Sequence, residues 1–484
     1  MQRYRCPNCK SGVEIKRIFD NRYLTLCQKC SLIHLSEIAQ KSQDDAYISF
    51  LDDYDEAKIQ PVKNLTAALQ KLSLTRTKDE VKQIMEDEGT NEDEVPRSVR
   101  RALFSKDDYL VAYKLYPPQS PKIGKLIKDL KVVKGLSEAL KTTNIQRLYA
   151  FQDGAFKEIT SGKDVAIVAP TGSGKTEAFT IPMVQMASQM CERIGGLKVI
   201  KSGVKVLFIY PTKALGRDQK PKLDIFWNAI GMRVEVLDGD TSRKDREMIL
   251  EDPPDAIVTN FDALHSHLMH RTRFAGILKG LRFIVVDEVH VYKGTFGSSV
   301  HFIVRRLERL CGKLQIVVSS ATISNPKEFC ADLFGREFVI VNGEGGRHGK
   351  VHLAILFPAT RSHRSLVIDL LKNLSRDGFK SIVFSSSHLG AELTAFYGRK
   401  NDVQIEVHRA GLLARHRVNV EQRFKRGELQ AVSSTPTLEL GIDIGHVDSV
   451  ISDLVPVTRL TQRAGRASRR GQEGAVFLAL RGTD

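Results

Sequence analysis

Short apolar runs alternate with longer stretches of helical composition over most of the chain. The first series of runs is DVAIV (164–168), VKVLFIY (204–210), RVEVL (233–237), DAIVT (255–259), LRFIVVD (281–287) and LQIVVSS (314–320). The second series is SIVFSS (381–386), VQIEVH (403–408), LQAVSS (429–434), DSVIS (448–452) and GAVFLAL (474–480). Continuous apolar strands separated by helices are typical of parallel sheets that are covered on both faces. The pattern predicts an α/β protein with two successive parallel-sheet lobes.

A polar, glycine-rich segment, VNGEGGRHGK (341–350), lies between the two series and is predicted to link the lobes. Three prolines between residues 117 and 121 mark the start of the first lobe. We therefore expect the first lobe over residues 122–340 and the second over residues 341–484.

The residues before the lobes have a different composition. Residues 36–121 are rich in charge and contain apparent helical stretches, with an acidic loop expected over 86–94. This segment fits a solvated linker as well as a packed helical adaptor. Residues 1–35 form a compact unit that carries four cysteines.

The charge balance favours a polyanionic partner. Lysine and arginine total 73 against 57 for aspartate and glutamate, which gives a formal net charge of +16. A basic surface attracts the phosphate backbone of nucleic acid, although solubility alone could also explain the excess. The charge therefore supports a nucleic-acid partner without identifying one.

Cellular location is indicated by what the sequence lacks and by its cysteines. No apolar run reaches about 18 residues, so no membrane span is expected. The N-terminal residues MQRYRCPNCK lack the apolar core of a signal peptide. Four of the seven cysteines form two C-x-x-C pairs, which suits a reducing compartment better than a disulfide scaffold. A cytoplasmic protein is expected.

A phosphate-binding loop is the strongest chemical signal. The segment APTGSGKT (169–176) follows an apolar run and opens a helical stretch, where backbone N–H groups and the helix N-terminus can bind phosphate. Lys175 would reach the β and γ phosphates, and Thr176 would ligate Mg²⁺. Ala169 occupies the position where the strict pattern has glycine. The candidate nucleotide-binding residues of this loop are Pro170, Thr171, Gly172, Ser173, Gly174, Lys175 and Thr176.

A second candidate motif ends another apolar run about 110 residues later. Asp287 is placed to hold Mg²⁺, directly or through water, and Glu288 to orient the attacking water. A single pair of acids after a strand would be weak evidence. The same pair in one lobe with a phosphate-binding loop is strong evidence for a nucleoside triphosphatase.

The sequence DEVH (287–290) resembles the DExH box of superfamily 2 helicases. Further motifs of that family lie before and after it, in the family's order, over residues 145–480. They resemble the adenine-reading glutamine (Gln152), motif Ia (PTKAL, 211–215), motif Ib (VTNFDAL, 258–264), the SAT motif (SSATIS, 319–324), motif V (SSTPTLELGIDIG, 433–445) and motif VI (QRAGRASRRG, 462–471). Eight motifs in order indicate a common ancestry.

The resemblance implies two RecA-like lobes that share one ATP site. Lys175 and Mg²⁺ would serve it from the first lobe, and Arg466 and Arg469 would act as arginine fingers from the second. Further implied ATP contacts are Gln152, Gly441 and Asp443. Implied coupling residues are His290, Ser320, Ala321, Thr322 and Gln462. Implied nucleic-acid contacts are Thr212, Lys213, Thr259, Asn260 and Thr435, for which a structural role such as a helix cap is an equal alternative.

One position departs from the family pattern. Motif VI usually reads QRxGRxGR, and Ser468 stands where its second glycine is usual. A serine there would tighten the loop that carries Arg466 and Arg469. The branch of the family stays open between Lhr-like helicases with the related DUF1998 group, which act on DNA, and archaeal Ski2-like RNA helicases. Both imply movement in the 3′-to-5′ direction.

The four N-terminal cysteines have the spacing of a zinc ribbon. Cys6 and Cys9 form one pair, and Cys27 and Cys30 form the other after 17 residues. Four thiolates satisfy a tetrahedral structural Zn²⁺, with His34 as a less favoured competing ligand. Such a unit could contact nucleic acid, dock a protein partner such as a nuclease, or simply stabilise the fold. The other cysteines, at 191, 311 and 330, are expected to be ordinary buried thiols.

The sequence therefore predicts an ATP-dependent helicase or translocase acting on single-stranded or tailed DNA or RNA. A remodelling translocase without processive unwinding, and a binding adaptor that uses the lobes as a scaffold, remain as alternatives. The sequence ends four residues after GAVFLAL (474–480), whereas the related families continue with further domains. A shortened or minimal form is expected.

Overall fold

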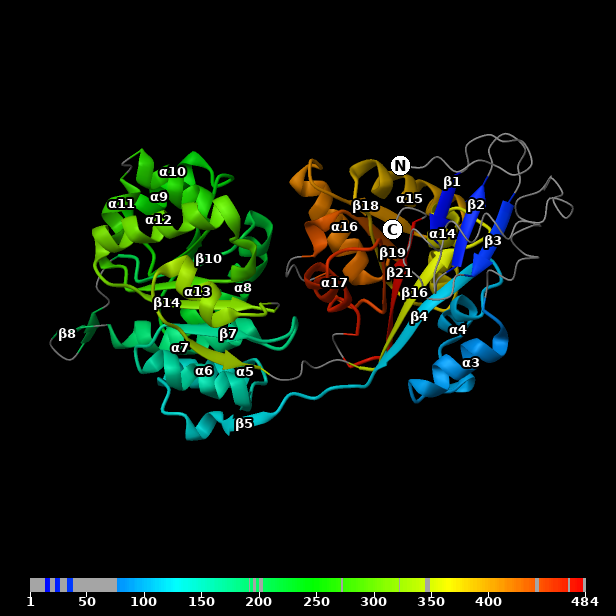
Figure 1. Cartoon of the computed structure of the whole chain (residues 1–484). Coiled ribbons are helices and arrows are strands. Elements are labelled where there is room, and N and C mark those ends of the chain that lie inside the picture. The colour runs from blue at the N-terminus through cyan, green and yellow to red at the C-terminus, as the bar shows by residue number, and fades with distance from the viewer. Residues whose placement is uncertain are drawn as a thin grey trace, which may run out of the picture.

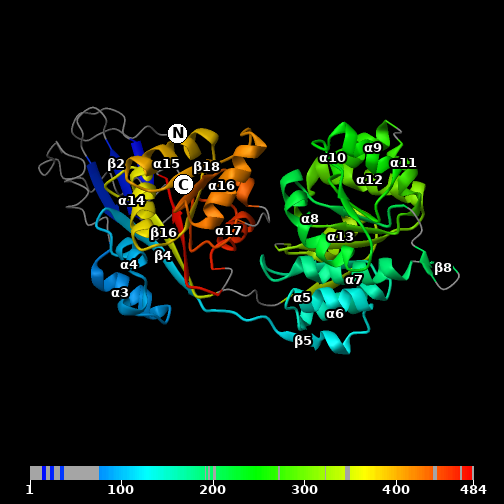
Figure 2. The same ribbon diagram turned by 180° about the vertical axis from the view of Figure 1, so that it is seen from behind.

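The computed structural model describes residues 76–484 except 191, 195–196, 200–202, 271–272, 322, 344–348, 440–443, 469–470 and 482–484. Three short strands nearer the N-terminus are described as backbone, and they form an antiparallel sheet: β1 (Glu14–Arg17), β2 (Arg22–Leu26) and β3 (Ile33–Glu37). The candidate zinc ligands Cys6, Cys9, Cys27 and Cys30 lie outside the described residues. Figures 1 and 2 show two lobes built around separate sheets.

The first lobe is built on seven parallel strands in the order β11-β12-β10-β13-β14-β7-β15. The strands are β7 (Val165–Val168), β10 (Val206–Ile209), β11 (Val234–Val236), β12 (Ala256–Thr259), β13 (Phe283–Val286), β14 (Gln315–Ser320) and β15 (Val339–Asn342). Two small antiparallel pairs flank the sheet: β5 (Ile123–Leu126) with β6 (Arg147–Tyr149), and β8 (Glu192–Ile194) with β9 (Leu197–Val199).

Helices cover both faces of this sheet. One face packs against α5 (Lys134–Thr142), α6 (Ala150–Thr160), α7 (Lys175–Gln189) and α8 (Lys213–Asn228). The other packs against α9 (Arg243–Glu251), α10 (Phe261–Met269), α11 (Phe274–Ile277), α12 (Gly294–Cys311) and α13 (Pro326–Phe334). Along β10, Val206 and Phe208 enter one core, whereas Leu207 and Ile209 enter the other. Because successive side chains point to opposite faces, burial of both faces requires an uninterrupted apolar strand.

The second lobe has seven strands in the order β18-β19-β17-β20-β21-β16-β4. The strands are β4 (Asp108–Tyr116), β16 (Val351–Pro358), β17 (Ser381–Phe384), β18 (Ile405–His408), β19 (Ala431–Ser434), β20 (Ser449–Ser452) and β21 (Gly474–Ala479). One face packs against α3 (Lys78–Asp87), α4 (Arg97–Leu103), α14 (His363–Arg376) and α15 (His388–Lys400). The other packs against α16 (Ala414–Arg426) and α17 (Val457–Ala464).

Short 3-10 turns connect several of these elements. They are η2 (Glu92–Glu94), η3 (Ile127–Asp129), η4 (Leu278–Gly280), η5 (Val289–Val291) and η6 (Pro436–Leu438). The turn η2 lies in the acidic stretch that the sequence predicted to be a loop.

The end of the N-terminal segment, for which a linker and a packed helical adaptor were equal alternatives, contributes a strand to the sheet of the second lobe. The helices α3 and α4 are present as the sequence indicated, but β4 pairs antiparallel with β16 and forms the edge of the second sheet. Asp108, at the start of β4, accepts a hydrogen bond of 2.8 Å from Arg361 Nε and pairs with its Nη2. The segment DYLVAYKLY contains a short apolar run, YLVAY, but only its pairing with β16 places it at the edge of the second sheet.

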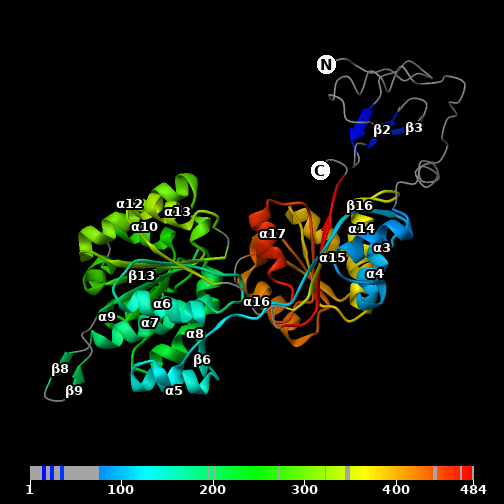
Figure 3. The same cartoon turned by 60° about the horizontal axis from the view of Figure 1, so that its bottom comes forward.

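All eleven strands expected from apolar runs are present. The strands β4, β15 and β16 of the two sheets were not predicted. In β16 buried and half-buried positions alternate, although its sequence VHLAILFP contains the apolar run LAILF. The strand β15 extends the first lobe to Asn342, two residues beyond the expected boundary. The chain passes between the lobes twice, after β4 and after β15, and the first crossing is visible in Figure 3.

A buried histidine connects β4 to the rest of the second sheet. His352 on β16 is 0% exposed, with Nδ1 2.7 Å from the Tyr113 hydroxyl and Nε2 2.7 Å from a Glu473 carboxylate oxygen. A neutral imidazole that donates from Nε2 to Glu473 can accept from Tyr113 at Nδ1. Burial lowers the pKa of His352, although the hydrogen bond to Glu473 opposes the shift.

Stability of the second lobe is expected to fall as the pH drops below about 6.5, the ordinary pKa of histidine. The unfolded chain then binds a proton at His352 that the folded chain excludes, which costs up to about 1.4 kcal/mol per pH unit. Urea unfolding at pH 8.0 and 5.5 measures the loss. His352→Asn should reduce this pH dependence, whereas His416→Asn at an exposed position should retain it. An equal pH dependence in wild type and His352→Asn would contradict the assignment.

Candidate active site between the two lobes

The phosphate-binding loop connects β7 to α7 at the carboxyl end of the first sheet. Gly172 has φ +78° and Gly174 has φ +92°, a conformation that side chains with a Cβ rarely adopt. A Cβ on Gly174 would lie only 2.5 Å from Gln152 Nε2. Gln152 donates from that nitrogen to Gly174 O at 2.9 Å, and its Oε1 accepts from Tyr149 N. The glutamine expected to read adenine therefore also supports the loop.

The two candidate catalytic residues that open α7 are engaged by neighbouring groups. Lys175 is 9% exposed and donates from Nζ to Ala169 O at 2.8 Å and to Pro170 O at 3.1 Å. Thr176 Oγ1 lies 3.2 Å from Oε1 of Gln219, a buried residue of α8. Gln219 was not predicted from the sequence, although it follows motif Ia on the same helix. Both side chains are close to the loop that would hold the phosphates.

The acidic pair follows β13 at the same edge of the sheet. Asp287 is 8% exposed, and its Oδ1 accepts hydrogen bonds from Ser319 Oγ and from Glu288 N. Burial and the charge of Glu288 raise the pKa of Asp287, while Ser319 and Lys175 oppose the shift. A divalent cation would stabilise the charged form of this carboxylate. Mg²⁺ needs few protein ligands because it retains waters and binds phosphate oxygens, so Asp287 with Thr176 fits such an ion.

Glu288 combines strained backbone with an unpaired buried oxygen. Its φ is +49°, a left-handed conformation that costs a residue with a Cβ about 1–2 kcal/mol. Glu288 is 6% exposed, and its Oε2 accepts no hydrogen bond from the described residues. Its nearest cationic candidate is His290 Nδ1 at 3.4 Å. Burial, followed by Lys293, lowers the pKa of His290 to about 4, so this contact is not an ion pair at neutral pH.

His290 connects the two lobes. Its Nδ1 lies 2.9 Å from Ser320 Oγ at the end of β14, and its Nε2 contacts the side-chain amide of Gln462 on α17. A neutral imidazole that donates from Nδ1 to Ser320 can accept from Gln462 at Nε2. The loop regions also meet, because a Cβ on Gly465 would lie 3.4 Å from Thr171 Cβ. Motif VI of the second lobe thus adjoins motifs I and II of the first.

The arginines of motif VI have unequal surroundings. Arg463 is 1% exposed, donates from Nε to Glu439 Oε1 at 2.6 Å and from Nη1 to Ser452 Oγ at 2.7 Å, and lies over the Phe384 ring. The buried pair of Arg463 and Glu439, which was not predicted from the sequence, ties motif V to motif VI. Arg466 is also 1% exposed and donates from Nη2 to Glu439 O at 3.0 Å.

The candidate nucleic-acid contacts of the first lobe begin helices or brace strands. Thr212 caps α8 by accepting from Leu215 N, Asn260 caps α10 by accepting from Ala263 N, and Thr259 donates to Leu237 O at 2.7 Å. These three side chains therefore cap helices or brace a strand. Their backbone lies at the carboxyl edge of the sheet, where a nucleic-acid strand could still contact it.

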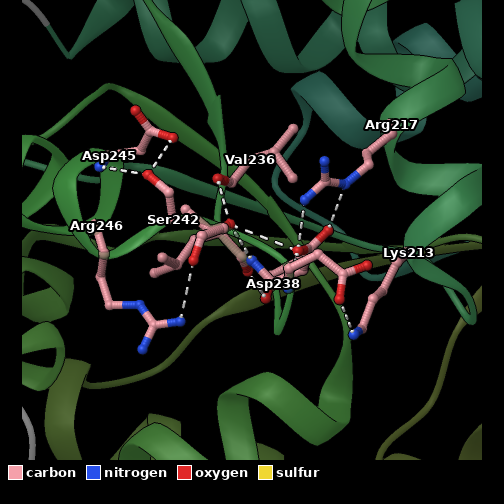
Figure 4. A network of polar contacts seen from close by, with 11 residues as sticks. Lys213, Arg217, Val236, Asp238, Ser242, Asp245 and Arg246 are labelled. Carbon is pink, nitrogen blue, oxygen red and sulfur yellow. Dashed lines mark hydrogen bonds and ion pairs between the residues drawn. The ribbon is translucent and has the colours of Figure 1, made fainter. Parts of the chain in front are cut away.

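Lys213 differs from them because it is exposed and charged. Its Nζ lies 2.6 Å from Asp240 Oδ1, and the neighbouring Arg217 makes two hydrogen bonds of 2.9 and 2.8 Å to Asp238 (Figure 4). Burial raises and the Arg217 guanidinium lowers the pKa of Asp238, and the net shift is downward. The loop after β11 thus holds the basic side chains of α8 in a fixed arrangement.

The remaining candidates are distributed between described and undescribed parts of the chain. Ser320 is 1% exposed and Ala321 follows it at the end of β14, while Thr435 is 4% exposed after β19. Thr322, Gly441, Asp443 and Arg469 lie outside the described residues. Within the described ranges no group of three or more histidine, cysteine or acidic side chains could hold a metal ion. Burial raises the pKa of Cys330 to about 12 and that of half-buried Cys311 to about 11, as expected for unreactive thiols.

Two family models match the chain in the order of the two lobes. The DEAD/DEAH box helicase model matches residues 149–329, and the helicase conserved C-terminal domain matches residues 362–471. A similar protein is MJ1574 of Methanocaldococcus jannaschii, described as an uncharacterized ATP-dependent helicase. It is 34% identical over 352 residues, which cover 69% of this chain and 50% of that protein.

Solved structures give the same picture. The DUF1998 helicase MrfA bound to DNA and AMPPNP is 28% identical, with a TM-score of 0.69, over 78% of this chain and 53% of MrfA. The helicase Lhr of Mycobacterium smegmatis, bound to ssDNA and AMP-PNP, is 26% identical, with a TM-score of 0.59, over 72% of this chain and 48% of Lhr. The chain thus spans about half the length of these relatives.

No helix in the described part of the chain combines the length and apolarity needed to cross a membrane. Both helicase domains are matched in order, and their motifs meet where the two lobes touch. The chain therefore carries the DEAD/DEAH box helicase domain and the helicase conserved C-terminal domain, and it is similar to the Lhr and DUF1998 helicases.

Proposed function

We propose that this chain hydrolyses ATP between its lobes and uses the reaction to move along single-stranded nucleic acid in the 3′-to-5′ direction. The observation that carries the proposal is the buried, unpaired Oε2 of Glu288 beside Asp287, at the place where His290 reaches Gln462 of the second lobe. A carboxylate oxygen without a donor in the described protein is available to a water molecule.

Each catalytic residue has a definite task in this proposal. Lys175 releases the carbonyl oxygens of the loop to bind the β and γ phosphates, while Thr176 and Asp287 would hold Mg²⁺. The ion, when bound with ATP, neutralises charge that develops on the phosphate oxygens. Glu288 orients the attacking water and accepts its proton. Gln152, next to Gly174, holds the adenine edge.

The second lobe completes the site. Arg466 and Arg469 stabilise the transferring phosphoryl group, while the Gly441 and Asp443 region contacts the nucleotide. Because Arg466 is buried against Glu439 O, it needs a change of side-chain conformation as the lobes close. Lobe closure is coupled to the strand-binding surface through the contacts of His290 with Ser320 and Gln462. Ala321 and Thr322, which follow Ser320, belong to the same coupling segment. Closure on ATP and opening after hydrolysis then produce a step.

DNA is the preferred substrate class in this proposal. The solved relatives above 25% identity include structures bound to DNA or ssDNA. Lys213, Thr435 and the ends of α8 and α10 would contact the sugar-phosphate backbone, so binding would be independent of sequence. Asp240 must release Lys213, or share it, when a phosphate binds. An adaptor with inactive lobes is disfavoured by the retention of Lys175, Asp287 and Glu288.

Lys175→Ala and Glu288→Gln are each expected to reduce nucleic-acid-stimulated ATP hydrolysis at least about 100-fold, because the first removes phosphate binding and the second removes the water-orienting carboxylate. Steady-state ATPase with single-stranded DNA and RNA of equal length measures both the loss and the preference. Lys163→Ala and Glu251→Gln on the surface of the same lobe are the matched controls. Turnover at the wild-type rate in either catalytic variant would refute the site.

Gly174→Ala is expected to weaken nucleotide binding more than about tenfold. The new Cβ would force Gln152 away from the loop, in addition to the strain of a positive φ. Gly162→Ala is the control, since Gly162 has φ +84° but a Cβ added there would meet no atom within 4 Å. Titration with a fluorescent ATP analogue measures the nucleotide affinity of both variants. Equal affinities in both variants would show that contact with Gln152 does not shape the loop.

Removal of zinc is expected to disturb the N-terminal unit while leaving basal ATPase intact. We propose that Cys6, Cys9, Cys27 and Cys30 bind a structural Zn²⁺. Metal analysis, together with circular dichroism and ATPase before and after chelation, tests this. Loss of basal ATPase would show that the unit is integral to the core, and a zinc-free native protein would refute the site. A nuclease or other partner docking on this unit would be lost on chelation.

A further inference from the structure

The second connection between the lobes is anchored at both ends by glycines that touch catalytic loops. Gly343 donates from its backbone N to Val168 O at 2.7 Å, directly before the phosphate-binding loop. A Cβ on Gly343 would lie 2.5 Å from the Cβ of Ala169, the first residue of that loop. Glycine is therefore required where the connection leaves the first lobe, because its backbone packs directly on motif I.

The other end packs on the turn after motif VI in the same manner. A Cβ on Gly349 would lie 2.0 Å from Gln472 O and 2.6 Å from Gly471 O. Six residue steps separate Gly343 from Gly349, which limits their distance to about 20 Å at full extension. A relative motion of the lobes that needed a greater separation would have to displace one of the two anchors.

Ser468 receives the second anchor. Gly349 N donates to Ser468 Oγ at 2.9 Å and to Ser468 O at 3.3 Å, and the hydroxyl in turn donates to Gln472 O. The Ser468 N–H donates to Val447 O at 3.1 Å, just after motif V. The side chain is 0% exposed. One residue therefore joins the interlobe connection, the end of motif V and the turn two residues after Arg466.

The backbone of Ser468 makes this arrangement costly. Its φ is +62°, a left-handed conformation that glycine adopts without strain and that a residue with a Cβ adopts at a cost of about 1–2 kcal/mol. Glycine, the usual residue at this position of motif VI, would fit the turn better. Only the hydroxyl distinguishes the serine in a favourable way, and its two hydrogen bonds offset the strain.

We propose that Ser468 is a positioning residue for ATP hydrolysis, whose hydroxyl ties the interlobe connection to the turn that carries Arg466. Movement of the lobes is transmitted through Gly349 and Ser468 to the arginine, in addition to the contact between His290 and Gln462. This inference rests on the proposed ATPase function, because Arg466 matters only if it stabilises the transferring phosphoryl group.

Ser468→Gly is the decisive variant, because it removes the hydroxyl and relieves the backbone strain. We expect its melting temperature to equal or exceed that of wild type, while the nucleic-acid-stimulated kcat falls roughly three- to tenfold and the affinity for ATP stays unchanged. Ser468→Ala should lose kcat to the same extent but also melt lower, since it retains the strain without the hydrogen bonds. A purely structural role would move kcat and melting temperature together.

Two control variants separate strain from contact. Asp402→Gly relieves a similar φ of +61° elsewhere in the second lobe, and Ser362→Ala removes a serine hydroxyl that caps α14. Both should keep wild-type kcat. Wild-type kcat in Ser468→Gly, in a protein whose hydrolysis depends on Lys175, would overturn the inference.

Hydrogen exchange provides a readout that does not need turnover. In Ser468→Gly, peptides that contain Gly349 and residues 462–474 should exchange at least about threefold faster together, while peptides of α14 should not change. Unchanged exchange at both places would overturn the inference. Absence of Lys175-dependent hydrolysis in wild type would instead refute the proposed function, and the exchange data would still decide whether the hydroxyl joins the two segments.

Discussion

Burial of both faces of a parallel sheet is the constraint on which the site depends. Because β7, β13 and β14 run in the same direction between two helical layers, their carboxyl ends share one edge. That edge carries Lys175 at the N-terminus of α7, Asp287 and Glu288 after β13, and Ser320 at the end of β14. Side chains separated by up to about 145 positions in the sequence thus lie near one another because the strands that carry them end at the same edge of the sheet.

Burial is the largest influence on the pKa values of the polar groups at this edge. Asp287 has its pKa raised by burial and by Glu288, and His290 is kept neutral by burial. A divalent cation bound beside Asp287 would lower the pKa of this carboxyl group and favour its charged form. The strained φ of Glu288 is a further local cost at the same place, as is common at functional sites.

The second lobe is completed by a segment from the beginning of the chain. The pairing of β4 with β16, together with Asp108–Arg361 and Tyr113–His352, makes the N-terminal region part of this lobe. The first lobe is therefore inserted between two parts of the second and is connected to it at two places. Two connections restrict the relative motion of the lobes more than one does, and the anchors at Gly343 and Gly349 place one of them against the catalytic loops.

The two α/β lobes, the strands that are buried on both faces and the positions of the phosphate-binding and acidic motifs could be predicted from the sequence. These features are local, because an apolar run or a glycine-rich loop follows from neighbouring residues alone. The sequence did not predict that β4 joins the second sheet, that Arg463 donates to Glu439, or that Ser468 accepts a hydrogen bond from Gly349. Each of these contacts joins residues that are distant in the sequence. Their hydrogen-bond donors and acceptors come within reach of one another only when the lobes fold.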